Sequence, residues 1–138
     1  MIGKTFVDSN ILLYAHDHDA DKKQRIAEEL LSELWASRQG VVSPQVLQEF
    51  YVNATRKLAQ PLTKPFAQSI VEKYATWCIE TTSAEVISAF RIEDEAKIGF
   101  WDALILASAA KAGAEVLLSE DLSSGQQIAG IRIQNPFV

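Results

Sequence analysis

Apolar positions follow two spacings along the chain, and segments of the two kinds alternate. Short segments that are apolar at nearly every position are typical of buried strands in parallel sheets. Longer segments repeat apolar residues every three or four positions, which predicts helices with one buried face. The expected strands are residues 4–7, 40–43, 78–81, 115–119 and 131–134.

Capping residues and helix breakers set the limits of the expected helices. Asp21 is a suitable N-cap for a helix that runs to about residue 37, and Pro44 suits the first turn of the next helix. Ser83 begins a capping signature, and Gly113 is a good C-terminal stop. The expected helices are residues 10–16, 21–37, 44–58, 65–74, 83–97 and 101–112.

Strands that alternate with helices predict an α/β fold in which helices cover both faces of a parallel sheet. We therefore expect a three-layer α/β/α sandwich with a central, mainly parallel sheet of roughly five strands. The 138 residues fit one domain that can bury a proper core, so residues 1–138 are expected to form a single domain.

Composition indicates an ordinary globular protein of a reducing compartment. Hydrophobic residues make up 48% of the chain and charged residues 22%, which argues against disorder. The single cysteine, Cys78, excludes an internal disulfide and suits the cytoplasm. We see neither an apolar run of membrane-spanning length nor a signal peptide at the N-terminus, so we expect a cytoplasmic protein without membrane contact.

The formal net charge is −5, which argues mildly against a protein that binds nucleic acid by neutralising phosphates with its own side chains. It does not exclude a nucleic-acid substrate. Metal ions held by an acidic cluster would reverse the local field at the place where a phosphate would lie.

Four acidic residues interrupt or follow apolar segments: Asp8, Glu49, Asp102 and Asp121. A carboxylate in such a segment is costly to bury unless it is paired or bound to a metal. Asp8 and Asp121 follow expected strands, while Asp102 and Glu49 lie on expected helices. Because ligands of open α/β sheets bind beyond the carboxyl ends of the strands, we expect all four at one edge of the sheet.

An all-carboxylate cluster favours Mg²⁺ or Mn²⁺ over zinc, because these hard cations prefer oxygen ligands. Such cations can activate water for phosphodiester cleavage. An acid of this kind taken alone is usually a helix cap or a solvated edge residue. The cluster is a stronger indication than its members, because all four fall on one predicted face.

The ordered motifs of the chain resemble those of PIN-domain ribonucleases and, within them, of the VapC-like toxins of bacterial toxin–antitoxin pairs. The resemblance covers essentially the whole chain. The segments that carry it are FVDSNILLYA (6–15), SPQVLQEFY (43–51), WDALI (101–105), LLSEDL (117–122) and IQNPF (133–137).

The resemblance implies an Mg²⁺- or Mn²⁺-dependent endoribonuclease that acts on RNA and serves as a toxin. Asp8 and Asp102 match the acids most directly tied to the metal, and Glu49 and Asp121 match the other two. Two polar residues would orient these carboxylates; they are Asn10 and Ser119. The resemblance also implies a homodimer and a cognate antitoxin that blocks the site.

One position departs from the family pattern: Gly99 stands where many relatives carry the serine that caps the helix of the third acid. Glycine is also accepted at the N-cap position, so we expect only a slightly less stable helix start. Two alternatives to the enzyme stay open. One is a catalytically silent PIN-type module that binds RNA or protein, and the other is a receiver-like signalling domain phosphorylated on an aspartate.

Overall fold

The sheet of the computed structural model, which describes residues 3–138, has five strands in the order β2-β1-β3-β5-β4. The paired strands run parallel, except that β4 and β5 are antiparallel. This confirms a mainly parallel sheet. The strands are β1 (Thr5–Val7), β2 (Gly40–Val41), β3 (Val116–Leu118), β4 (Gln127–Ile128) and β5 (Ile131–Gln134).

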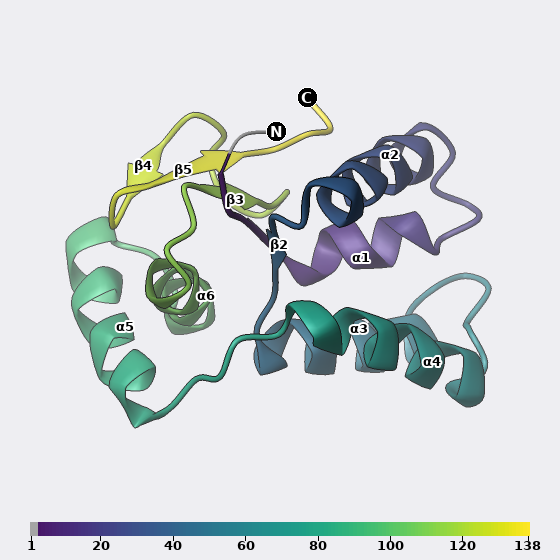
Figure 1. Ribbon diagram of the computed structural model, residues 1–138, viewed down its shortest axis with the longest axis horizontal. Helices are drawn as coiled ribbons and strands as arrows, with labels where there is room; N and C mark the ends of the chain where they lie inside the picture. The colour runs from purple at the N-terminus through teal and green to yellow at the C-terminus, as the bar shows by residue number, and fades with distance from the viewer. Residues whose placement is uncertain (1–2) are drawn as a thin grey trace.

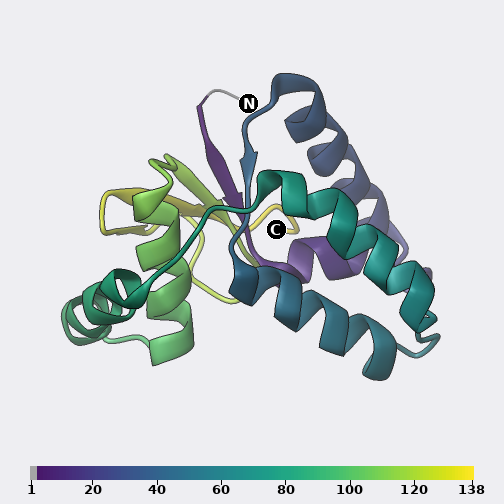
Figure 2. The same ribbon diagram turned by 60° about the horizontal axis from the view of Figure 1, so that its bottom comes forward.

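Helices lie on both sides of this sheet, which confirms the three-layer sandwich. The last two helices lie together on one side, and the first four gather on the other (Figure 1, Figure 2). The helices are α1 (Ser9–Ala15), α2 (Lys22–Ser37), α3 (Pro44–Arg56), α4 (Lys64–Tyr74), α5 (Ser83–Ala96) and α6 (Phe100–Lys111), with a 3-10 turn, η1 (Ala75–Trp77). No helix in residues 3–138 is both long and apolar enough to cross a membrane.

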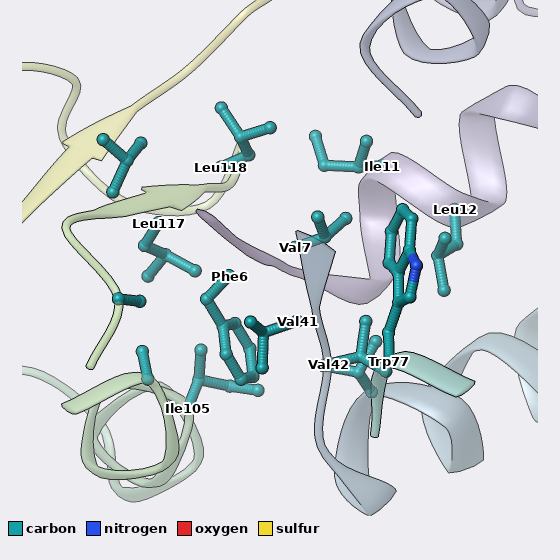
Figure 3. Close-up of a cluster of buried hydrophobic side chains, with 14 of the residues drawn as sticks. Phe6, Val7, Ile11, Leu12, Val41, Val42, Trp77, Ile105, Leu117 and Leu118 are labelled. Atoms are coloured by element: carbon teal, nitrogen blue, oxygen red, sulfur yellow. The ribbon is translucent and has the colours of Figure 1, made fainter. Parts of the chain in front are cut away.

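The core is built on the central strands, which are buried along their whole length because both faces of the sheet are covered. Phe6 of β1 lies toward Ile105 of α6, while Ile11 of α1 lies near Val7 on the opposite side (Figure 3). Trp77 stands beside Leu12. Full burial of side chains of this size stabilises the fold by about 1.5–3 kcal/mol each.

The prediction of a strand at residues 78–81 is wrong. Cys78 makes only an isolated parallel bridge with Val42, through hydrogen bonds that Val42 N donates to Trp77 O (3.1 Å) and Ile79 N donates to Val42 O (3.0 Å). The chain turns away at once, because Thr82 is already the N-cap of α5. The apolar residues of this segment are therefore explained by packing beside β2.

Sequence reasoning missed β4, which pairs with β5 at the edge of the sheet opposite to β2. A tight turn at Ala129 and Gly130 joins β4 to β5, and both residues have positive φ (54° and 78°). Such turns favour Asn-Gly or Gly-Gly, so alanine at the first position gave no hairpin signal.

Two helix caps differ in detail from the expectation. Asp21 occupies the N-cap position of α2, but its side chain makes no capping hydrogen bond there. The N-cap of α5 is Thr82, one residue before the expected Ser83, and it forms a complete capping box with Glu85. The helix beginning at this signature is therefore confirmed, with its cap shifted by one residue.

The strand order reverses between β1 and β3, the kind of position at which open α/β sheets bind ligands. The chain leaves β1 toward β2 on one side and later returns to β3 on the other, so the order reverses at this point. Asp8 directly follows β1, and its backbone N–H donates to Leu118 O at the end of β3 (3.0 Å). The two strand ends therefore deliver their following residues to the same place.

Candidate functional site

Asp8 is the buried centre of the site, with 4% of its surface exposed. Its Oδ1 accepts a hydrogen bond from Ser9 N (2.7 Å), and its Oδ2 accepts one from Ser119 Oγ (2.8 Å). Ser119 is fully buried directly after β3. Because each carboxylate oxygen has its own donor, the orientation of the Asp8 side chain is fixed.

Asp121 is held in the same hydrogen-bond network. Its backbone N–H donates to Ser119 Oγ (3.1 Å), and its Oδ2 accepts a hydrogen bond from Asn10 Nδ2 (3.2 Å). The other end of the Asn10 amide, Oδ1, accepts from Glu120 N (3.3 Å). We call Asp8, Asn10, Ser119 and Asp121 the strand half of the site, because it is built around the ends of β1 and β3.

The loop that carries Asp121 has a second anchor outside the acidic cluster. Glu120 accepts hydrogen bonds from Tyr14 Oη (2.7 Å) and from Lys23 Nζ (2.7 Å). Burial raises the pKa of Glu120, but these two hydrogen bonds outweigh it and leave the pKa below its ordinary value. Lys23 also lies over the Tyr14 ring, 4.8 Å from its centroid. This fifth acid therefore ties the loop to α1 and α2.

Glu49 lies on α3 and is half-buried. Its Oε1 accepts a hydrogen bond from Ser9 Oγ (3.3 Å) and its Oε2 accepts one from Gln45 Nε2 (3.5 Å). Gln45 Nε2 also donates to the backbone oxygen of Trp101 at the start of α6 (3.3 Å). Gln45 thus connects the two helices that carry Glu49 and Asp102.

Asp102 lies in the first turn of α6, three residues after its N-cap Gly99, as the sequence predicts. The partial positive charge of the helix N-terminus favours a carboxylate there. Within residues 3–138, no hydrogen bond to the Asp102 carboxylate is among the causes of its pKa shift. We call Glu49, Gln45 and Asp102 the helix half of the site.

The pKa shifts show that the four acids lie within electrostatic reach of one another. The pKa of Asp8 is raised to about 6, first by burial and then by the charges of Glu49 and Asp121, despite the hydrogen bonds from Ser119 and Ser9 that lower it. Burial also raises the pKa of Glu49, to which Asp102 and Asp121 contribute. The pKa of Asp102 is raised by burial and then by Asp121.

The acids differ in burial more than the sequence suggests. Asp8 is buried and Glu49 and Asp102 are half-buried, but Asp121 is exposed, although it follows an apolar strand. Sequence alone placed it in apolar surroundings, whereas two residues of loop separate it from β3 and leave it in solvent.

The donor set suits a small hard cation in kind, because every candidate ligand is a carboxylate oxygen. In the described part of the chain, however, no three His, Cys, Asp or Glu side chains are arranged so that they could hold a metal ion directly. Mg²⁺ usually keeps several water ligands and needs only one or two carboxylates. The acids therefore fit a partly hydrated cation better than a closed cage.

Three residues of the network were not singled out from the sequence: Ser9, Gln45 and Glu120. Gln45 carried a usable signal, because residues four apart on a helix lie on the same face and Glu49 follows it at that spacing. Ser9 and Glu120 sit next to candidate acids, but their contacts cross between distant segments.

Comparison with known proteins agrees with this architecture. A family model described as the PIN domain matches residues 5–123. No curated protein sequence matches the chain. A toxin–antitoxin complex from Klebsiella pneumoniae contains a chain that is 20% identical, with a TM-score of 0.65 over 96% of this chain and 98% of that one.

Two further solved structures are similar over nearly their whole length. A DNA-bound VapBC from Salmonella typhimurium is 20% identical, with a TM-score of 0.68 over 98% of this chain and 99% of that chain. The Mycobacterium tuberculosis toxin VapC20, described as cleaving the sarcin-ricin loop, is 18% identical, with a TM-score of 0.61 over 94% and 99%. At such identities the likeness concerns the fold. Because the family model spans most of the chain and the fold agrees, the chain belongs to the PIN-domain family.

Proposed function

We propose that this protein is a divalent-metal-dependent endoribonuclease, using Mg²⁺ or Mn²⁺, and that it acts as the toxin of a toxin–antitoxin pair. Asp8, Glu49, Asp102 and Asp121 form its catalytic and metal-binding site. The observation that carries the proposal is the gathering of these four acids at the strand-order reversal of a PIN-domain fold.

The roles of the residues follow from how each is held. Asp8 offers a carboxylate in one fixed orientation, because Ser9 and Ser119 bind its two oxygens. Because the pKa of Asp8 is raised, a cation that binds this carboxylate must displace its proton. Cation affinity therefore rises with pH. Ser119 donates to Asp8 and accepts from the backbone N–H of Asp121, and Asn10 donates to the Asp121 carboxylate, in the manner of outer-shell partners in metal sites.

A cation bound by these acids supplies Lewis acidity to a phosphodiester and makes a water ligand more acidic. Asp102 and Glu49 would hold it from the helix half, where few hydrogen bonds restrain them. Asp121 is exposed and would be accessible to a phosphate from solvent. Burial is the main cause of the raised pKa values of Asp8, Glu49 and Asp102, and the charges of neighbouring acids add to it, so a bound cation would favour the ionised form of each.

RNA is the substrate we propose, despite the net charge of −5. A cation between the acids and the phosphate converts local repulsion into attraction. The proposed partners are a cognate antitoxin that blocks the site and a second copy of the chain in a homodimer. This part rests on toxin–antitoxin complexes among the similar structures.

The proposal is tested by RNA cleavage with the purified chain. We expect cleavage with Mg²⁺ or Mn²⁺, loss of cleavage with EDTA, and growth inhibition on expression in a bacterium. Asp8→Asn and Asp102→Asn should each reduce cleavage by about 100-fold or more, since even outer-shell changes cost 10–100-fold. The matched control is Asp94→Asn, which makes the same change at an exposed position of α5. Cleavage that survives in both site variants would refute the mechanism.

The catalytically silent PIN module is a second candidate, and one observation favours it. Within residues 3–138 no three acids are arranged to hold a metal directly. Calorimetric titration with Mn²⁺ separates the two candidates. Binding that Asp8→Asn weakens and Asp94→Asn does not supports the enzyme, whereas no binding supports the silent module. The receiver-like alternative is set aside, because the chain belongs to another family and its sheet ends in an antiparallel hairpin.

A further inference from the structure

Trp101 is a large aromatic side chain left in solvent at the edge of the acidic site. Its surface is 64% exposed, although tryptophan is usually well buried in folded proteins. It occupies the first turn of α6, directly before Asp102. Because the Cα atoms of neighbouring residues lie about 3.8 Å apart, the indole and the Asp102 carboxylate start from adjacent points of the same helix turn.

The position of Trp101 is restrained from two sides. Its backbone oxygen accepts a hydrogen bond from Gln45 Nε2 (3.3 Å), the same group that donates to Glu49. Its ring meets the ring of Phe100 edge-on, at 5.2 Å between centroids and 73° between planes. Phe100 in turn packs against the core. An exposed aromatic ring thus packs against Phe100 at the start of the helix that carries Asp102.

We propose that the Trp101 indole is a stacking platform for one unpaired base of the RNA beside the bond that is cut. The inference rests on the proposed function and deepens it by naming the form of the substrate. Every base has a face that can stack on an aromatic ring, so this contact selects unpaired nucleotides without reading their sequence. A base in a duplex is covered by its neighbours and cannot use the platform.

A base suits this position better than the surface of a second protein copy. A protein docked over Trp101 would also desolvate Asp102, whose carboxylate has no ion pair with a described lysine or arginine, and burying an unpaired charge is costly. A nucleotide places its flat base on the indole and leaves the acids open to its phosphate and a cation. The apolar surface that suits a protein lies further along, at Phe90 and Ile87 of α5, which are 51% and 65% exposed.

Phe90 is therefore a matched control for Trp101. It belongs to the same aromatic cluster, since its ring lies 5.9 Å from that of Phe100, but it stands on α5, which carries none of the four site acids. Removing either exposed ring should leave the fold intact. A melting curve of each variant checks this, and Trp101→Phe keeps an aromatic face at the site.

The experiment measures RNA affinity by fluorescence anisotropy in the chain that retains all four acids, with Ca²⁺ in place of Mn²⁺. Ca²⁺ also prefers carboxylate oxygens, so the cation site stays intact, and a gel checks that the RNA is not cut. The probes are a labelled 12-nucleotide RNA of mixed sequence, the same strand in a duplex, and single-strand versions with an abasic residue at each position in turn. We expect Trp101→Ala to weaken single-strand binding by about tenfold or more. Trp101→Phe should retain most of the affinity, and Phe90→Ala should change it less than twofold.

The abasic series makes the test specific to stacking. At one position, removing the base should weaken binding to the protein that retains Trp101 but have little further effect on Trp101→Ala, because the two changes delete the same contact. Equal effects of Trp101→Ala and Phe90→Ala would overturn the platform. So would a Trp101→Ala protein that loses dimerisation in sedimentation while keeping its preference for single strands. If no RNA binds even with Trp101 present, the proposed function itself fails.

Discussion

The strand half and the helix half of the acidic site are held in different ways. In the strand half, Asp8 and Asp121 are fixed through Ser119 and Asn10, and further hydrogen bonds clamp the adjoining loop. In the helix half, Glu49 accepts two longer hydrogen bonds, and the orientation of Asp102 rests on the start of α6. The strand half is preorganised, while the helix half is free to adjust to a cation and an RNA.

The largest expected effect concerns the burial of Asp8, whose pKa is raised to about 6. Between pH 4 and pH 6 the folded protein keeps a proton that the unfolded chain has released, so stability falls as pH rises through this range. The contribution amounts to about 3 kcal/mol at 1.36 kcal/mol per pKa unit. The raised pKa values of Glu49 and Asp102 act with the same sign.

Urea unfolding of EDTA-treated protein between pH 4 and pH 7.5 measures this contribution. The wild-type chain should lose about 3 kcal/mol relative to Asp8→Asn over the interval, because only the former must bury a charge. Asp94→Asn should follow the wild type throughout. If the difference in unfolding free energy between wild type and Asp8→Asn did not change with pH, the pKa of the buried Asp8 carboxyl would not be raised in the folded state.

The next prediction compares the two halves by removing one hydrogen-bond donor from each and measuring the loss of Mn²⁺ affinity. Ser119→Ala removes the buried hydroxyl that joins Asp8 to Asp121, and we expect Mn²⁺ affinity to fall by about 10–100-fold. Gln45→Ala removes a longer contact to Glu49 and should cost only a few-fold. Calorimetry on both variants measures the difference. Equal losses would remove the distinction between a preorganised half and an adaptable one.

A smaller effect concerns the loop anchor at Glu120. Tyr14→Phe deletes one hydroxyl that donates to Glu120 without changing the charge of the site. We expect a loss of about 1.5 kcal/mol in unfolding free energy and a few-fold weaker Mn²⁺ binding, since the acceptor is charged and its loop carries Asp121. Tyr51→Phe is the control, because that hydroxyl only accepts from Gln68, between α3 and α4. Weaker Mn²⁺ binding in the control as well would show that the loss is not specific to the loop.

The smallest effect concerns the start of α6. Gly99→Ser places a capping hydroxyl where an added Cβ meets no atom within 4 Å and φ is −70°. We expect an increase of about 0.5 kcal/mol in stability, from reduced freedom of the unfolded chain and a better cap. Gly113→Ser should instead destabilise by about 1 kcal/mol, because φ there is +73°. A destabilised Gly99→Ser would contradict the interpretation of Gly99 as a weak cap.

The strand half was the part of the site that the sequence predicted best, for a physical reason. The carboxyl ends of parallel strands meet at one edge of the sheet, so apolar runs followed by Asp8 and by Asp121 implied that these two acids lie near each other. The β4–β5 hairpin and the single bridge at Cys78 were not predicted, because both depend on backbone geometry that apolar patterning does not record.

Side-chain contacts between distant segments were also beyond sequence reasoning. The hydrogen bond from Ser9 to Glu49 joins residues 40 positions apart, and that from Tyr14 to Glu120 joins residues 106 apart. Such contacts follow only once the helices are packed. The exposure of Asp121 likewise depends on the path of a short loop, whereas the burial of Asp8 follows from its place beside the central strand.

The most direct measurement asks whether the two halves hold one and the same cation. Mn²⁺ affinity is measured by calorimetry for wild type, Asp8→Asn, Asp102→Asn and the double variant, with Asp94→Asn as control. If both acids serve one cation, each single change weakens binding strongly and the double variant is little worse than the weaker single variant. A single site built from both halves would be contradicted if the fold-losses in Mn²⁺ affinity of the two single variants multiplied in the double variant. It would also be contradicted if Asp8→Asn or Asp102→Asn bound Mn²⁺ as tightly as Asp94→Asn does.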